Sequence, residues 1–100
     1  MPQRSASPPK RRKVTFYCDA PGATKVAVVG TFNAWDPIRH PMHHGGGGRW
    51  NKSLFLPPGK YEYKFWIDGQ WREDPHNPHT RPNAFGTVNS ILSVPVDESV

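Results

Sequence analysis

The sequence is poor in the features of secreted and membrane proteins. Its 100 residues include a single cysteine, Cys18, so no internal disulfide can form, and a reducing compartment, the cytoplasm, is expected. No stretch approaches the roughly 20 apolar residues that a membrane span requires. The N-terminus is basic but has no apolar run behind it, so it does not resemble a secretory signal. No membrane partner is therefore expected.

Catalytic and metal-binding patterns are also missing. Acid–base hydrolysis requires two carboxylates at a fixed separation across a cleft, whereas the carboxylates here fall mostly in predicted turns or at the termini. No Gly-x-Ser-x-Gly motif occurs, and the glycines at 45–48 lack the Lys-Ser/Thr of a phosphate loop. We therefore expect no enzyme activity, no metal ion and no cofactor. No carboxylate or second cysteine completes a metal set with the histidines, which are His40, His43, His44, His76 and His79.

The surplus of positive charge is confined to the N-terminus. The net charge of +5 comes from 13 Lys and Arg against 8 Asp and Glu, and residues 1–13, MPQRSASPPKRRK, hold basic residues but no acid. This Pro- and Ser-rich segment cannot bury apolar surface, so we predict a disordered basic tail over 1–13. PPKRRKV is similar to nuclear-localisation and nucleic-acid-binding patches, which keeps nucleic-acid association as an alternative. The net-neutral remainder has no overall field to attract a polyanion, so a nucleic-acid partner is not expected.

What the sequence does contain is a series of short strand patterns separated by turns. Hydrophobic residues make up only 35%, while 12 prolines and 9 glycines favour short strands over helices. Strands at spacings of about 10 residues indicate an antiparallel β-sandwich. We predict one domain over 14–96 without helices, followed by a C-terminal tail at 97–100. The predicted strands are 14–19, 25–32, 49–56, 60–67 and 88–96, with irregular loops at 33–48 and 74–85.

Three conspicuous residues have structural interpretations. Trp50 is in phase with Leu54 and Leu56 and is predicted to belong to the core. Gly30 lies inside a strand pattern rich in β-branched residues, which predicts a bulge or the close approach of another backbone. Cys18 is predicted to be an inert, partly buried thiol.

The segment KYEYKFWIDGQWREDP, residues 60–75, predicts an exposed aromatic face. Apolar residues alternate with others from 61 to 67, which is typical of a strand with one buried face. Asp-Gly at 68–69 favours a two-residue type I′ hairpin. In that register Trp66 lies opposite Trp71, on one face with Lys64. Large aromatic rings beside a cation on the solvent side of a sheet predict a binding surface.

Four segments occur in an order and spacing typical of one family. They are VAVVGTFNAW, GRW…LFLPPG, YEYKFWIDGQWREDP and GTVNSILSV. Over about residues 14–94 they closely resemble carbohydrate-binding module family 48, found in the β subunit of AMP-activated protein kinase and in the N-terminal domains of isoamylases and glycogen-branching enzymes. The resemblance implies an all-β, immunoglobulin-like (early-set) antiparallel sandwich of about seven strands. It also implies α-1,4-linked glucan as the ligand.

The resemblance implies that two tryptophans stack on sugar. Trp35, which ends GTFNAW, and Trp71, after the Asp-Gly turn, resemble the platforms on which glucose rings lie. Trp66 falls where the family often has another bulky apolar residue. An indole covers the apolar C–H patch of a glucose ring without requiring hydrogen bonds. Each stacked ring contributes about 1–2 kcal/mol, so one site is expected to bind at roughly micromolar to millimolar concentration.

Further site residues follow from the same resemblance. Lys64 resembles the lysine that hydrogen-bonds sugar hydroxyls, and Thr87 and Asn89 in AFGTVNS resemble the polar pair of the site. Phe85 stands where the kinase β subunits carry a leucine that threads into a curled glucan, and it retains an apolar knob there. The expected function is non-catalytic binding of α-1,4-linked glucan such as glycogen, starch or malto-oligosaccharides.

Protein partners are a separate question. A glycogen-metabolising enzyme is a candidate partner of such a module. The alternative to sugar binding is a regulatory adaptor whose sandwich docks a protein. Kinase β subunits carry a further C-terminal segment for assembly, and this chain ends at Val100, so association with the kinase is not expected.

Overall fold

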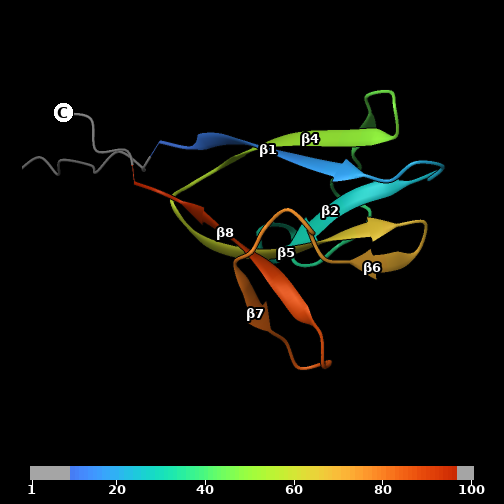
Figure 1. Cartoon of the computed structure of the whole chain (residues 1–100). Coiled ribbons are helices and arrows are strands. Elements are labelled where there is room, and N and C mark those ends of the chain that lie inside the picture. Colours follow the sequence, from blue (N-terminus) through green and yellow to red (C-terminus); the bar gives the residue numbers. More distant parts are fainter. Residues whose placement is uncertain (1–9, 97–100) are drawn as a thin grey trace, which may run out of the picture.

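In the computed structural model, which describes residues 10–96, two antiparallel β-sheets pack face to face (Figure 1). One sheet has the strand order β1-β4-β3, and the other has the order β2-β5-β8-β7, with β6 paired to β5. This arrangement confirms the predicted all-β antiparallel sandwich. The strands are β1 (Arg12–Asp19), β2 (Val26–Gly30), β3 (His43–His44), β4 (Arg49–Leu56), β5 (Gly59–Ile67), β6 (Gln70–Arg72), β7 (Thr80–Pro82) and β8 (Val88–Val94).

The ends of the chain fall largely outside the described residues. This applies to most of the disordered tail predicted over 1–13 and to the whole of the tail predicted over 97–100. In the described part β1 begins earlier than predicted, because Arg12 already pairs with Leu56 of β4. The strand predicted over 25–32 ends at Gly30, and a single 3-10 turn, η1 (Thr31–Asn33), follows it.

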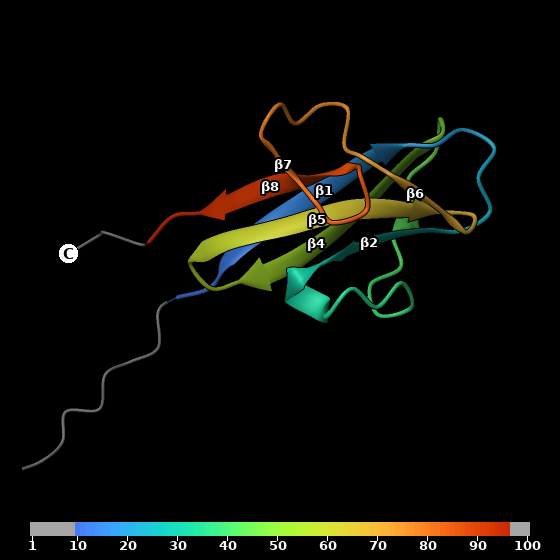
Figure 2. The same ribbon diagram turned by 90° about the horizontal axis from the view of Figure 1, so that it is seen from below.

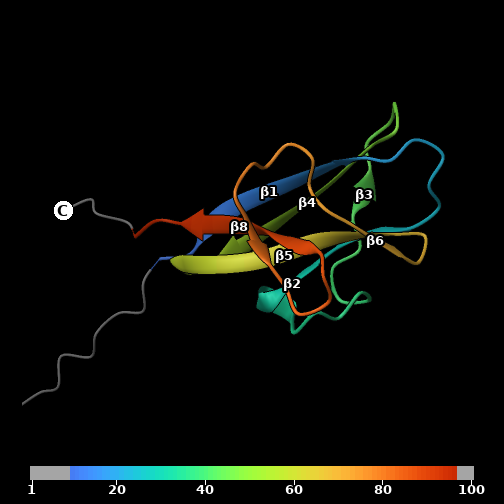
Figure 3. The same cartoon turned by 60° about the horizontal axis from the view of Figure 1, so that its bottom comes forward.

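Two segments predicted as irregular loops contain short strands, so that prediction was wrong in part. The 33–48 loop includes β3, whose His44 pairs with Trp50 and stacks on its indole at a centroid distance of 4.7 Å. The 74–85 coil includes β7, which pairs with β8 from Thr80 to Pro82 (Figure 3). Pro82 is tolerated because β7 is an edge strand, where one side of the backbone needs no ladder partner. Both are local pairings, but β3 and β7 are too short to show the alternating pattern by which a strand is predicted.

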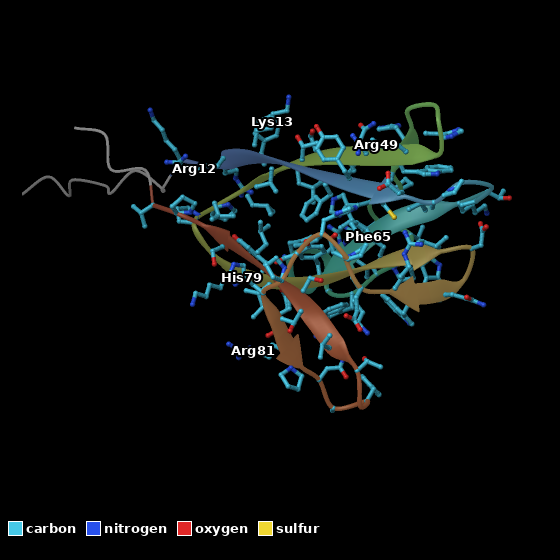
Figure 4. All side chains as sticks on the ribbon, viewed as in Figure 1. Arg12, Lys13, Arg49, Phe65, His79 and Arg81 are labelled. Carbon is cyan, nitrogen blue, oxygen red and sulfur yellow. The ribbon has the colours of Figure 1, made fainter. Side chains whose placement is uncertain are left out.

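The hydrophobic core lies between the two sheets. Phe65 on β5 is fully buried, and Phe16 on β1 contacts Tyr63 on β5 edge-on, with ring centroids 5.1 Å apart. Trp50 is buried, as predicted. Figure 4 shows Phe65 between the two layers, whereas Arg49 points away from them on the outer side of the three-stranded sheet. Figure 2 shows the five-stranded sheet from below, that is, from its outer side. The side chains of the β5–β6 hairpin that do not point into the core lie on this outer side.

One arginine joins the two sheets beside the core. The Nη2 of Arg72, at the end of β6, donates to the carbonyl oxygen of Asp19 at 2.5 Å and to the Sγ of Cys18 at 3.2 Å, both on β1. Burial raises the pKa of the Cys18 thiol, and the charge of Arg72 opposes that shift. The thiol is therefore protonated at neutral pH, and it is buried more completely than predicted.

Gly30 confirms the predicted close approach of another backbone. A Cβ at this position would overlap the carbonyl oxygen of Glu62 and would lie 2.9 Å from both the Phe32 ring and the Cβ of Tyr63. Only glycine lets β2 and β5 keep their spacing here. The carbonyl oxygen of Gly30 also accepts a hydrogen bond from the amide of Trp35 at 2.9 Å. The close approach is thereby linked to the loop that carries Trp35.

Candidate functional site

The β5–β6 hairpin has the predicted register. Trp66 pairs with Trp71 across a turn whose two residues both have positive φ, as a type I′ turn requires. The carboxylate of Asp68 in this turn accepts hydrogen bonds from the amides of Thr24 at 3.0 Å and Lys25 at 2.7 Å. These bonds tie the hairpin to the segment before β2. The position of Trp71 is therefore set by the sheet and by this anchor together.

A tight turn after η1 carries Trp35 to the same face. Ala34 and Trp35 have φ values of 57° and 59°, which are uncommon for residues other than glycine. The buried side chain of Asn33 holds the turn, because its Oδ1 accepts the amide of Gly30 and its Nδ2 donates to the carbonyl of Val28, each at 3.1 Å. Strain of this kind persists only where the surroundings enforce it, and it clusters at binding sites.

Three indoles gather on this face. The ring centroids of Trp35 and Trp71 are 6.2 Å apart with planes inclined at 68°, and those of Trp66 and Trp71 are 4.7 Å apart with planes inclined at 67°. Trp71 is 46% exposed, whereas Trp35 and Trp66 are half-buried. Trp66 is therefore less open to solvent than predicted, since it packs edge-on against Trp71. The inclined pair of Trp35 and Trp71 forms an angled apolar surface.

Lys64 departs from the predicted exposed position. It lies on the outer face of β5 but is only 8% exposed, because Thr87, from the turn between β7 and β8, covers it. The Nζ of Lys64 donates to the Thr87 hydroxyl at 2.8 Å, and the Nδ2 of Asn83 donates to the same oxygen at 2.7 Å. The hydroxyl accepts twice, so its proton is left to donate outward, and the ammonium has further N–H groups. This part of the site therefore offers donors to a ligand.

The hydrogen-bond acceptors of the site belong to Glu62 and Asn89. Glu62, two residues earlier on β5, accepts a hydrogen bond from the Nδ2 of Asn89 at 2.9 Å and lies 3.6 Å from the Nε of Arg81. The Oδ1 of Asn89 in turn accepts from the Nδ2 of Asn83 at 3.0 Å. The orientations of the carboxylate and the amide are thus fixed in advance. Fixed polar groups beside apolar planes suit a ligand that has both hydroxyls and apolar patches.

Phe85 projects from the turn between β7 and β8 and is 89% exposed. Asn83 shapes this turn, because its Oδ1 accepts the amides of Phe85 at 2.9 Å and Thr87 at 3.2 Å. Gly86 supplies the positive φ of 82° that the turn needs. Figure 1 shows the turn extending beyond the body of the sheet. Phe85 therefore presents an apolar ring at the rim of the site.

These side chains surround one open hollow of about 650 Å³. It brings together all six residues implied by the family resemblance. Trp66 does not line the hollow, but it packs against Trp71, which does. Three further lining residues, Thr31, Glu62 and Asn83, were not predicted. The alternation of β5 places Glu62 on the same face as Lys64. Thr31 and Asn83 lie in turns, which have no periodic pattern from which a site residue could be predicted. The lining residues are Thr31, Trp35, Glu62, Lys64, Trp71, Asn83, Phe85, Thr87 and Asn89.

The stability of the Trp35 turn should depend on pH through His40. The Nδ2 of Asn33 lies 2.9 Å from the Nδ1 of His40, which can accept this hydrogen bond only when the nitrogen is unprotonated. Burial lowers the pKa of His40 below its ordinary value of 6.5, and Lys52 and Arg39 lower it further. Between the lowered folded value and 6.5 the unfolded state binds more protons, so stability falls as the pH drops below about 6.5.

The check is the melting temperature at a series of pH values between 8 and 5. We expect His40→Gln, which cannot take up a proton, to lose part of the decrease seen in the wild type over this window. His79→Gln, at an exposed position, is the matched control and should keep the wild-type slope. Parallel curves for wild type and His40→Gln would contradict the assignment. The titration of Asp19 does not interfere with this measurement. Hydrogen bonds to His76 and Arg49 lower the pKa of Asp19 from its ordinary value of 3.8, so its contribution to stability is lost only at pH values below this window.

Within residues 10–96, no group of three or more His, Cys, Asp or Glu side chains could hold a metal ion. No helix of the described part is long and apolar enough to cross a membrane.

An antiparallel sandwich with angled indoles and fixed polar groups around one open hollow defines a carbohydrate-binding module. Residues 13–100 match the model of a family described as the glycogen recognition site of AMP-activated protein kinase. The chain belongs to this family. Its members are non-catalytic, glucan-binding domains.

Similar proteins are longer than this chain. The β-1 subunit of 5'-AMP-activated protein kinase from Homo sapiens is 34% identical over 86 residues, which cover 86% of this chain and 30% of the subunit. The chloroplastic PTST homolog 2 from Arabidopsis thaliana is 45% identical over 72 residues, 72% of this chain and 13% of that protein. The chain thus spans less than a third of these relatives. A maltogenic amylase from S. marinus shares the fold with a TM-score of 0.74 at 21% identity, over 88% of this chain and 14% of the amylase.

Proposed function

We propose that this domain binds α-1,4-linked glucan by stacking glucose rings on Trp35 and Trp71. Lys64 and Thr87 donate hydrogen bonds to sugar hydroxyls, and the amide of Asn89 contributes a further polar contact. Phe85 covers an apolar patch of the glucan at the rim. The proposed activity is binding without catalysis, so no bond of the glucan is broken.

The observation that supports this proposal best is the angle of 68° between the two indole planes, in a hollow that Lys64 also lines. An α-1,4 chain curls, so successive glucose rings meet an angled pair of platforms better than a flat one. Indole faces cover the C–H patches of the rings, while the equatorial hydroxyls need both donors and acceptors. The hollow supplies all three kinds of group.

We propose glycogen or starch as the natural form of the ligand, and a glycogen-metabolising enzyme as the protein that the domain serves. The relatives named above are a kinase subunit and a chloroplastic protein, and the domain occupies only part of each. A single site of this kind binds weakly, at roughly micromolar to millimolar concentration. A branched polymer with many chain ends compensates for weak single sites through multivalency.

Native gel electrophoresis with and without glycogen in the matrix tests the proposal. We expect glycogen and starch to slow the domain, whereas dextran, whose main linkage is α-1,6, leaves its mobility unchanged because its chain does not curl in the same way. Unchanged mobility in glycogen would reject sugar binding and would favour a protein-docking adaptor instead. Equal retardation by dextran would reject the proposed α-1,4 preference.

A further inference from the structure

A second hollow adjoins the proposed glucan site. Its volume is about 620 Å³, close to that of the first. Three residues, Lys64, Trp71 and Thr87, line both hollows. These three side chains therefore form the border between the two hollows. A glucan chain lying on Trp71 can extend into either of them.

The second hollow is more polar than the first. Beyond the shared border it is lined by the charged side chains of Asp19, Arg72 and Glu73, together with Pro75. Asp19 carries an ion pair with Arg49 at 3.4 Å. The charges of the lining residues balance, so the hollow has no strong preference for an ionic ligand. A neutral ligand with many hydroxyls fits this lining.

Arg72 is held in place before any ligand binds. Its Nη2 is used by the carbonyl oxygen of Asp19 and the Sγ of Cys18, and its Nε and Nη1 donate to no group within the described residues 10–96. Glu73 follows directly in the chain, is exposed, and forms no ion pair in the same range. A fixed donor next to a carboxylate acceptor suits a pair of neighbouring sugar hydroxyls, which donate and accept together.

We propose that the second hollow is an extension subsite, in which Arg72 and Glu73 hydrogen-bond the glucose units that follow those stacked on Trp35 and Trp71. This inference rests on the proposed function and adds a dependence on chain length. A short malto-oligosaccharide occupies only the first hollow. A longer one crosses Trp71 and reaches both, so the domain prefers extended glucan chains.

Isothermal titration calorimetry with maltotriose and maltodecaose tests this inference. A longer chain also offers more binding registers, so the comparison is made between variants for each sugar. We expect Glu73→Ala to weaken maltodecaose binding by roughly threefold to tenfold, the effect of losing one hydrogen bond of ordinary net strength at an exposed position, and to leave maltotriose binding within about twofold. Lys60→Ala, which removes an exposed charge at the other end of β5, is the matched control and should bind both sugars as the wild type does.

The outcomes separate the two proposals. If Glu73→Ala weakens the binding of both sugars equally, or the binding of neither, the extension subsite is rejected while glucan binding stands. If the wild type binds neither maltotriose nor maltodecaose, the proposed function itself is rejected. A selective loss for maltodecaose supports the subsite. The melting temperature of Glu73→Ala should equal that of the wild type, because the side chain is exposed and carries no ion pair within residues 10–96.

Discussion

Replacement of Trp71 by alanine is expected to weaken malto-oligosaccharide binding by roughly 5- to 30-fold, since a stacked ring contributes about 1–2 kcal/mol and each 1.4 kcal/mol is tenfold in affinity. Trp71 lines both hollows and contacts Trp35 and Trp66, so its loss removes a platform and frees the two neighbouring rings. Calorimetry with maltoheptaose and retardation in glycogen gels both measure the effect.

The control for Trp71→Ala is Phe55→Ala. Phe55 is also an exposed aromatic residue, at 60% exposure, but it lies on β4 in the other sheet. We expect this variant to bind as the wild type does. Trp71 is half exposed and outside the core, so Trp71→Ala should stay folded, with a melting temperature close to the wild-type value. Binding of Trp71→Ala within twofold of the wild type would show that stacking on this indole is not the source of affinity.

Replacement of Gly30 by alanine is expected to destabilise the fold by about 3 kcal/mol or more, at the upper end of overpacking costs. The new Cβ would overlap the carbonyl oxygen of Glu62 and crowd the Cβ of Tyr63, both on β5, so the two strands would have to separate. In a domain of this size 1 kcal/mol corresponds to about 4–8 °C in melting temperature. Thermal unfolding followed by circular dichroism should therefore show a decrease of at least about 12 °C.

Gly46→Ala provides the comparison for Gly30→Ala. Gly46 has a φ of 94°, and nothing lies within 4 Å of an added Cβ, so only backbone strain of about 1–2 kcal/mol is expected. Gly30→Ala should also bind glucan more weakly, because the Gly30 carbonyl accepts the amide of Trp35. A loss of stability no greater than that of Gly46→Ala would contradict the close approach of β2 and β5.

The hairpin that carries Trp71 could be predicted from local sequence. Alternation along β5 determines which face of the sheet each side chain takes, and the Asp-Gly turn determines the register, so the pairing of Trp66 with Trp71 follows from residues within one short segment. The same register brings Lys64 and Trp71 to one face, but Trp35, Phe85, Thr87 and Asn89 could be named only through the family resemblance, because they come from other parts of the chain. Their spacing alone contains no sign that Trp35 meets Trp71.

The polar half of the site could not be predicted in the same way. The alternation places Lys64 on the outer face and predicts it in solvent, yet it is buried there beneath Thr87, which comes from the turn between β7 and β8. Asn83 organises that turn through four hydrogen bonds, yet it looks like any loop asparagine in the sequence. Contacts of this kind depend on the relative placement of strands, which local patterns do not encode.

The sequence by itself determined the class of fold, the inward face of β5 and the hairpin register, because these follow from a period of two and from the backbone preferences of Asp and Gly. The tertiary structure alone decided that Trp35 meets Trp71, at what angle, and which polar groups surround them. The physical reason is that β2, β5 and β8 become neighbours only after distant segments pair. The hollow forms in the space that this pairing leaves on the outer face of the sheet.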